Sequence, residues 1–208
     1  MLCCPMNTSL DTTRLVLASS SPRRQQLLRA AGVVFDVIAP PLPEPEDVVQ
    51  HLPPARQAEA LAYFKARAVA DLHGKRRVLG ADTIVAADGE VLGKPADRRD
   101  AERMLRRLSG TRHAVITGVA LLLPGGRRWI GSATTYVTMR PMTDAEIDGY
   151  LASGEWAGKA GAYAIQETAD RFVVGLEGSF SNVVGLPVEL VERLLARSFQ
   201  ADGEAAKG

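Results

Sequence analysis

The first residues that could do chemistry are hydroxyl and guanidinium groups between an expected strand and an expected helix. Residues 19–24 read Ser-Ser-Ser-Pro-Arg-Arg and follow the apolar run 15–18. A helix N-terminus binds anions because its first N–H groups are unpaired and carry partial positive charge. The Ser19 hydroxyl and the forked guanidinium groups of Arg23 and Arg24 add donors suited to phosphate oxygens. This segment predicts a phosphate-binding loop, with a plain helix cap followed by two solvated arginines as the alternative.

A carboxylate stands inside one of the most apolar stretches of the chain. Asp82 lies in the segment 77–87, which reads as a strand interrupted at residues 81–83. An unpaired buried charge costs so much free energy that Asp82 requires a partner there, either a metal ion or a lysine. The alternative is an ordinary aspartate at the edge of a strand.

Two lysines and one glutamine are further candidates. Lys94 lies between a glycine and a proline, and Lys65 lies on an alanine-rich segment. By themselves, such lysines are usually solvated surface residues. Gln166 ends the run 159–166, which, like 178–187, is rich in small residues that let a ligand reach the backbone. Its amide could read the edge of a base, and the alternative is a tight-turn region that leaves Gln166 exposed.

Histidines and cysteines offer no metal site. His51, His73 and His113 lie in three separate segments without ligand spacing, so none is assigned to a metal or to a base. Cys3 and Cys4 are adjacent and are the only cysteines of the sequence. This excludes a disulfide framework and a cysteine-based zinc site, and it favours a reducing compartment.

The elements that must position these groups alternate between helix and strand early and form a hairpin in the middle. An Asp-Gly pair at 88–89 predicts a tight hairpin turn, and Thr143 followed by Glu146 predicts a capped helix start. We therefore expect an α/β fold with a mixed sheet flanked by helices, not a doubly wound parallel sheet. Helices are expected at 22–31, 56–73, 97–108, 143–153 and 187–199, and strands at 15–18, 33–39, 77–87, 90–92, 113–123, 129–139 and 172–176.

The chain has room for one catalytic domain. Its 208 residues suffice for a single α/β domain made of two lobes around a cleft. We expect this domain to span residues 14–199. The leader 1–13 and the small, polar tail 200–208 are expected to be disordered.

Charge and hydropathy exclude two kinds of partner. Lys and Arg number 25 and Asp and Glu 24, and aromatic residues make up 5% of the sequence. A nucleic-acid-binding protein would show a strong basic excess, so no nucleic-acid partner is expected. No apolar run approaches the ~20 residues that span a bilayer, so no membrane partner is expected either. A small anionic ligand remains compatible with the balanced charge.

Together these segments resemble the Maf family of septum-formation-inhibitor-like proteins. The resemblance covers nearly everything between residues 14 and 197, with its motifs in order. It implies a cytoplasmic, metal-dependent pyrophosphatase that converts a nucleoside triphosphate to the monophosphate and pyrophosphate. It also implies a fold related to the inosine-triphosphatase group and a homodimer. The resemblance extends from Leu-Ala-Ser-Ser-Ser-Pro-Arg-Arg at 17–24, through Gly-Ala-Asp-Thr at 80–83, Gly-Lys-Pro at 93–95 and Lys-Ala-Gly-Ala-Tyr-Ala-Ile-Gln at 159–166, to Val-Gly-Leu-Pro at 184–187.

The resemblance also assigns roles to individual side chains. Asp82 is implied as the proton acceptor and, with Glu44, as a ligand of a divalent cation, Mg²⁺ or Mn²⁺. The remaining implied site residues are Ser19, Arg23 and Arg24 in the phosphate-binding loop, Lys65 and Lys94 among the catalytic polar groups, and Arg23, Thr83 and Gln166 at positions linked to substrate choice.

Within the family, Asp-Thr at 82–83 and Ile-Gln at 165–166 look like the branch that acts on dTTP and UTP. The 7-methyl-GTP branch tends to carry Asp-Gln and Ser-Glu there. The amide of Gln166 offers one donor and one acceptor, which match N3–H and O4 of thymine or uracil. A carboxylate would instead accept two hydrogen bonds, as guanine requires, and such mismatches are strongly selective at a buried site.

Two alternatives to a dTTP/UTP pyrophosphatase remain. One is a 7-methyl-GTP pyrophosphatase, and the other is a non-catalytic nucleotide-binding regulator of cell division. Asp82, Glu44 and the two lysines disfavour the regulator, because binding alone does not require a carboxylate that activates water.

Overall fold

The computed structural model of this chain describes residues 14–42, 46–166 and 168–205. Within them, one sheet has the strand order β2-β1-β3-β5-β6-β7, with β4 paired to β3. β1 pairs in parallel with β2 and β3, and the other pairs are antiparallel. The predicted mixed sheet is therefore confirmed. Its strands are β1 (Leu15–Leu17), β2 (Phe35–Val37), β3 (Val78–Ala87), β4 (Glu90–Leu92), β5 (Arg112–Leu122), β6 (Arg128–Met139) and β7 (Val173–Glu177).

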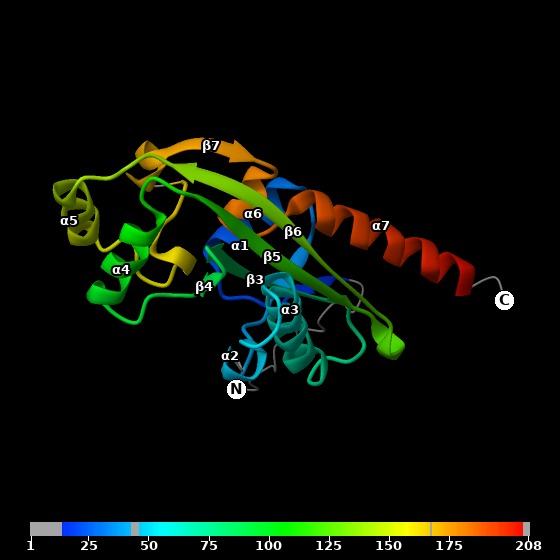
Figure 1. Cartoon of the computed structure of the whole chain (residues 1–208). Coiled ribbons are helices and arrows are strands. Elements are labelled where there is room, and N and C mark those ends of the chain that lie inside the picture. Colours follow the sequence, from blue (N-terminus) through cyan, green and yellow to red (C-terminus); the bar gives the residue numbers. More distant parts are fainter. Residues whose placement is uncertain (1–13, 43–45, 167, 206–208) are drawn as a thin grey trace, which may run out of the picture.

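Helices cover both faces of this sheet. Figure 1 shows α3 against one face, whereas α1, α6 and α7 lie on the other side of the long β5–β6 hairpin. The described helices are α1 (Pro22–Ala30), α2 (Glu46–Val49), α3 (Pro54–Ala70), α4 (Arg98–Leu108), α5 (Asp144–Ser153), α6 (Phe180–Val184) and α7 (Val188–Ala205), besides three short 3₁₀ turns. None of them is both long and apolar enough to cross a membrane.

Two glycines allow α3 to lie very close to the sheet. A Cβ atom at Gly80 on β3 would lie 2.3 Å from the carbonyl oxygen of Ala62. A Cβ at Gly118 on β5 would lie 2.2 Å from the carbonyl group of Ala58. Because neither glycine has a side chain, the backbone of α3 rests directly on the two strands. The helix thereby brings its own side chains to the edge of β3.

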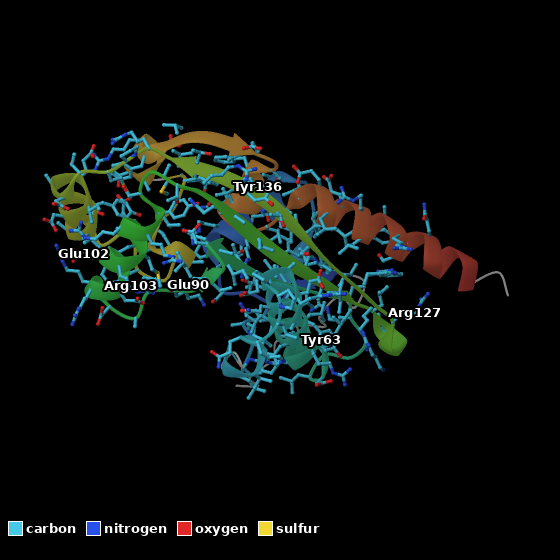
Figure 2. All side chains as sticks on the ribbon, in the orientation of Figure 1. Tyr63, Glu90, Glu102, Arg103, Arg127 and Tyr136 are labelled. Atoms are coloured by element: carbon cyan, nitrogen blue, oxygen red, sulfur yellow. The ribbon has the colours of Figure 1, made fainter. Side chains whose placement is uncertain are left out.

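The opposite face carries two hydrophobic clusters. Helices α1 and α7 pack on β1, β3 and β5 through Leu28, Leu79 and Val191, among others. Helices α4 and α5 pack on β3, β5 and β6 in a second cluster that includes Leu105 and Tyr150. Figure 2 shows Glu90 of β4 beside Arg103 of α4. The Glu90 carboxylate and the Arg103 guanidinium group lie 2.8 Å apart. This surface ion pair links β4 to α4.

Local turn and capping signals were read correctly from the sequence. β3 and β4 form the hairpin expected at the Asp-Gly pair, where Asp88 has φ 47° and Gly89 has φ 79°. Thr143 and Glu146 form both hydrogen bonds of the expected capping box at the start of α5. Both features depend on residues that are close in the chain.

Three expectations were wrong or incomplete. β3 runs without interruption through residues 81–83, because β5 pairs with it from Val78 to Ala86. α7 continues to Ala205, so residues 200–205 are helical where disorder was expected. The short helix α6 falls in the small-residue segment 178–187, where no helix was predicted. The leader 1–13 and residues 206–208 lie outside the described residues.

Candidate active site

A cavity of about 790 Å³ opens at the edge of β3. β1 pairs with β3 at Val78 and Leu79, and β4 pairs with it from Val85 onward. Between these two pairings no described strand covers this edge of β3. Neighbouring residues of a strand point to opposite faces, yet Asp82 and Thr83 both line the cavity. The gap between β1 and β4 makes this possible, since an open edge is reached from both faces.

The cavity brings the predicted site residues together. The segments 18–24, 157–160, 163–166 and 183–185 form much of its wall. Glu44, predicted as a metal ligand, lies outside the described residues. Every other predicted site residue lines the cavity: Ser19, Arg23, Arg24, Lys65, Asp82, Thr83, Lys94 and Gln166.

Asp82 forms a buried ion pair with Lys65. The Nζ atom of Lys65 donates to Oδ1 of Asp82 over 2.5 Å, and the two residues are 6% and 5% exposed. The expected partner of Asp82 is therefore a lysine, delivered by α3 across Gly80 and Gly118. The reading of Lys65 as a solvated helix lysine is wrong. A carboxylate has two oxygens with about four acceptor sites, so this pairing leaves it capacity for water or a cation.

Contacts from different parts of the chain hold the Arg24 side chain. Its Nε donates to the carbonyl of Gly185 over 2.8 Å, and its Nη2 donates to Thr83 Oγ1 over 3.1 Å. Its Nη1 lies 3.4 Å from Oγ of Ser19. Gly185 has φ 126°, a left-handed conformation that disfavours other residues. These contacts fix the plane of the guanidinium group, so its positive charge faces the cavity in a fixed orientation.

The start of α1 supplies N–H groups on the same side. Ser21 caps the helix by accepting from the N–H of Arg24, and Pro22 occupies the first turn. The N–H of Ser21 donates to Oγ of Ser19. Ser19 as a residue is 4% exposed. No acidic residue stands in the first turn of α1. The first turn of α1 therefore contributes no carboxylate that would compete with an anionic ligand.

The charges around the cavity are strongly unbalanced. Asp82 is the sole carboxylate that the described residues contribute to the lining, and Lys65 neutralises it. Lys159 is an additional lining cation to which sequence reasoning gave no role, although it begins the small-residue run 159–166. The lining cations are Arg23, Arg24, Lys65, Lys94 and Lys159. Their excess suits a ligand that carries several negative charges, such as a chain of linked phosphates.

Burial divides the cavity into a deep part and an outer part. Ser19, Lys65 and Asp82 are buried, whereas Lys94 and Gln166 are exposed. The base-reading hypothesis relies on selection at a buried site, whereas the Gln166 side chain is exposed in this structure, as in the alternative interpretation. Donor–acceptor selection at Gln166 therefore requires that a bound base cover its amide.

The donor set fits a cation that arrives with a polyphosphate. No group of three or more His, Cys, Asp or Glu side chains within the described residues is arranged to hold a metal ion. Mg²⁺ commonly uses one or two carboxylates together with substrate phosphates and water. Asp82 offers one such carboxylate, so the chemistry of the site fits Mg²⁺ or Mn²⁺ shared with a ligand.

A buried tyrosine and histidine stand behind one wall. Tyr163 lines the cavity, and its hydroxyl lies 2.8 Å from Nε2 of His113, with the rings edge to face. His113 is 2% exposed, and desolvation lowers its pKa from 6.5 to about 4. Burial also raises the pKa of the Tyr163 hydroxyl. Both groups are therefore neutral at pH 7.

The neutral state of His113 predicts an acid-sensitive fold. The unfolded chain binds a proton at this histidine near pH 6.5, whereas the folded chain binds it near pH 4. Stability is therefore lost as pH falls from 6.5 toward 4, by about 2 kcal/mol at pH 5. Denaturant unfolding at pH 7.5 and pH 5 measures this loss. His113→Gln should remove it, whereas the exposed His51→Gln should keep it, and equal losses in all three proteins would contradict the assignment.

The sheet and the cavity define a mixed α/β protein with a pocket lined by several cations, and comparison with known proteins names its family. The model of the family described as Maf-like protein matches residues 14–198. The chain therefore belongs to the Maf family, as its sequence motifs predicted.

Several relatives and solved structures are similar to this chain. A "dTTP/UTP pyrophosphatase" of Moorella thermoacetica is 50% identical over 88% of this chain and 94% of that protein. Another "dTTP/UTP pyrophosphatase", from Syntrophotalea carbinolica, is 47% identical over 97% of this chain and 95% of its own. A HAM1 protein from Coxiella burnetii aligns with a TM-score of 0.49 at 17% identity, covering 89% of this chain and 99% of that chain.

Proposed function

We propose that this protein is a nucleoside triphosphate pyrophosphatase that hydrolyses dTTP and UTP to the monophosphate and pyrophosphate. The observation that carries the proposal is the cavity itself, in which several cations and a helix N-terminus surround one buried carboxylate. A triphosphate supplies the negative charge that such a site is built to hold. The name shared by the relatives from M. thermoacetica and S. carbinolica supports the same activity.

In this proposal Asp82 acts on the attacking water. Hydrolysis requires that a water molecule lose a proton as it attacks the α-phosphorus and that pyrophosphate leave. Asp82 forms an ion pair with Lys65 at 2.5 Å, and we assign it the role of orienting and deprotonating this water.

The cations stabilise the phosphates as charge moves onto the leaving pyrophosphate. Arg24 is preset by its contacts with Gly185 and Thr83, and Arg23 and Lys94 line the same cavity. Donors fixed in advance stabilise developing charge without reorganising during the reaction. These groups therefore favour the transition state over the bound substrate.

We further propose that Mg²⁺ or Mn²⁺ takes part, held by Asp82 and Glu44 together with substrate oxygens. When bound, such an ion neutralises phosphate charge and lowers the pKa of coordinated water. The family resemblance also leads us to propose that the protein acts in the cytoplasm as a homodimer.

Gln166 is proposed to select the base. Its exposed amide lines the outer part of the cavity. A thymine or uracil edge would cover it and match its one donor and one acceptor, whereas guanine offers two donors. The preference therefore depends on a contact formed when the nucleotide binds.

A nucleotide panel tests both parts of the proposal. Wild type and Gln166→Glu are incubated with Mg²⁺ and with dTTP, UTP, CTP or 7-methyl-GTP, and the products are identified by chromatography. Wild type should release pyrophosphate from dTTP and UTP, and Gln166→Glu should lower kcat/KM for these two by about tenfold relative to 7-methyl-GTP.

The panel separates the rival functions. Release from 7-methyl-GTP in preference to dTTP would identify the other branch of the family. Tight binding of dTTP without any product would favour the regulator. An unchanged base preference in Gln166→Glu would remove the amide from the specificity argument without affecting the reaction.

A further inference from the structure

Two threonines connect the cavity to the interior of the sheet. Nη2 of Arg24 donates to Oγ1 of Thr83 over 3.1 Å. The same Thr83 oxygen lies 2.9 Å from Oγ1 of Thr117. The Thr117 hydroxyl donates to the backbone oxygen of Asn182 over 3.2 Å. Thr83 lines the cavity, whereas Thr117 is fully buried behind its wall. A continuous hydrogen-bond chain thus leads from a cavity cation to the helix α6.

Each group in this series of hydrogen bonds donates in the same direction, from Arg24 toward Asn182. A guanidinium group can only donate, and each threonine hydroxyl has one hydrogen. Since Thr117 gives its hydrogen to Asn182, it accepts the hydrogen of Thr83, and Thr83 accepts from Arg24. A second acceptor near Thr83 is the carbonyl of Gly185, which is farther away at 3.4 Å and already accepts from Arg24. Hydrogen bonds aligned in this way strengthen one another.

The far end of the chain is rigid. Asn182 is fully buried, and its Nδ2 donates to the carbonyl of Val115 over 3.0 Å and to Oγ1 of Thr135 over 2.9 Å. These bonds tie α6 to β5 and β6. The backbone oxygen of Asn182 also accepts from the N–H of Gly185. The acceptor at the end of the chain and the Gly185 carbonyl that holds Arg24 therefore belong to one fixed turn.

We propose that Thr117 is a positioning residue for the pyrophosphatase reaction: its hydroxyl orients Thr83 and, through Thr83, the guanidinium of Arg24. This inference rests on the proposed function. It also gives the Thr83 hydroxyl a physical role, because Thr83 acts on Arg24 and not on the base. Loss of either hydroxyl should therefore weaken the handling of phosphates equally for every nucleotide.

A different role for Thr117 would be to fasten α6 to β5 without involving Arg24. In that case, removing its hydroxyl would destabilise the fold and would act independently of Thr83. A double-mutant cycle separates the two roles, because residues that act through one chain give non-additive effects.

The test compares Thr117→Val, which keeps the shape and removes the hydroxyl, with Thr117→Ser, which keeps the hydroxyl. Thr117→Val should lower kcat/KM for dTTP and UTP by the same factor, about fivefold, which corresponds to one lost hydrogen bond. Thr117→Ser should restore activity to near wild type. Adding Thr117→Val to Thr83→Val should cause no further loss, and the melting temperature of Thr117→Val should stay close to that of wild type.

Calorimetric titration with inorganic tripolyphosphate keeps this inference separate from the proposed function. Even if wild type hydrolysed no nucleotide, Thr117→Val should raise the Kd for tripolyphosphate by about fivefold. Failure of turnover would then overturn the proposed function alone. The positioning role would be overturned if Thr117→Val bound tripolyphosphate with wild-type affinity. It would also be overturned if Thr117→Ser and Thr117→Val lost kcat/KM equally, or if the double variant lost more kcat/KM than Thr83→Val alone.

Discussion

Asp82→Asn is expected to lower kcat for dTTP hydrolysis by about 10²-fold or more, beyond any loss of folded protein caused by leaving Lys65 without its charged partner. Asparagine keeps the size of the side chain and an oxygen that can accept from Lys65 Nζ, now 2.5 Å from Oδ1. It lacks the negative charge that would take a proton from water. Steady-state kinetics with dTTP and Mg²⁺, together with a thermal melt of the same sample, measure both effects.

Asp88→Asn provides a matched control for this substitution. Asp88 is exposed and follows the end of β3, and its φ of 47° is a conformation that asparagine tolerates well. This control should retain wild-type activity and stability. Undiminished turnover in Asp82→Asn would defeat the assignment of Asp82 as the proton acceptor. A loss of activity that follows only from a collapsed melting temperature would reassign Asp82 to a purely structural ion pair.

Sequence reasoning succeeded where the relevant residues are neighbours in the chain. The turn at Asp88 and Gly89 and the capping box of Thr143 and Glu146 form as predicted. The start of α1 also lies where the sequence predicts it, because Ser21 and Pro22 define the first turn of the helix. Each of these signals is satisfied by local hydrogen bonds and needs no knowledge of the sheet.

The sequence does not predict burial and contacts that depend on strand register and tertiary packing. Taken alone, Lys65 is predicted to be solvated. Its burial depends on how closely α3 approaches the sheet, which the sequence does not show. Thr117 received no role, since its contact with Thr83 follows from the direct pairing of these residues between β3 and β5. The sequence left open whether the Gln166 side chain is covered, and the structure leaves it exposed. The polar tail was expected to be disordered, yet alanine and glutamate in it are good helix formers and α7 continues to Ala205.

Family resemblance supplied what neither local signals nor periodicity could. It grouped Ser19, Lys65 and Asp82, which come from three separate elements, into one site, and the cavity contains all three. The structure adds why this grouping works. β1 and β4 leave the edge of β3 open between them, so a helix start, a helix side chain and a strand carboxylate meet there.

Gly118→Ala is expected to destabilise the fold by about 3 kcal/mol, a large effect for one added methyl group. Its Cβ would lie 2.2 Å from the carbonyl carbon and oxygen of Ala58. These are backbone atoms of α3, which cannot rotate away as a side chain could. Gly118 is also the register partner of Asp82, so pushing α3 outward moves Lys65 away from the carboxylate. The variant should therefore lose activity as well as stability.

Gly131→Ala on β6 is the matched control, because a Cβ there meets nothing nearer than the flexible tip of Leu190 at 3.7 Å. This variant should unfold within about 0.5 kcal/mol of wild type. Denaturant unfolding compares the two alanine variants, and dTTP turnover of the folded fraction shows whether the ion pair has moved. If both variants unfolded at the same midpoint, α3 could not be resting on Gly118. If Gly118→Ala were unstable but fully active once folded, Lys65 would not depend on the close approach of α3 for its position beside Asp82.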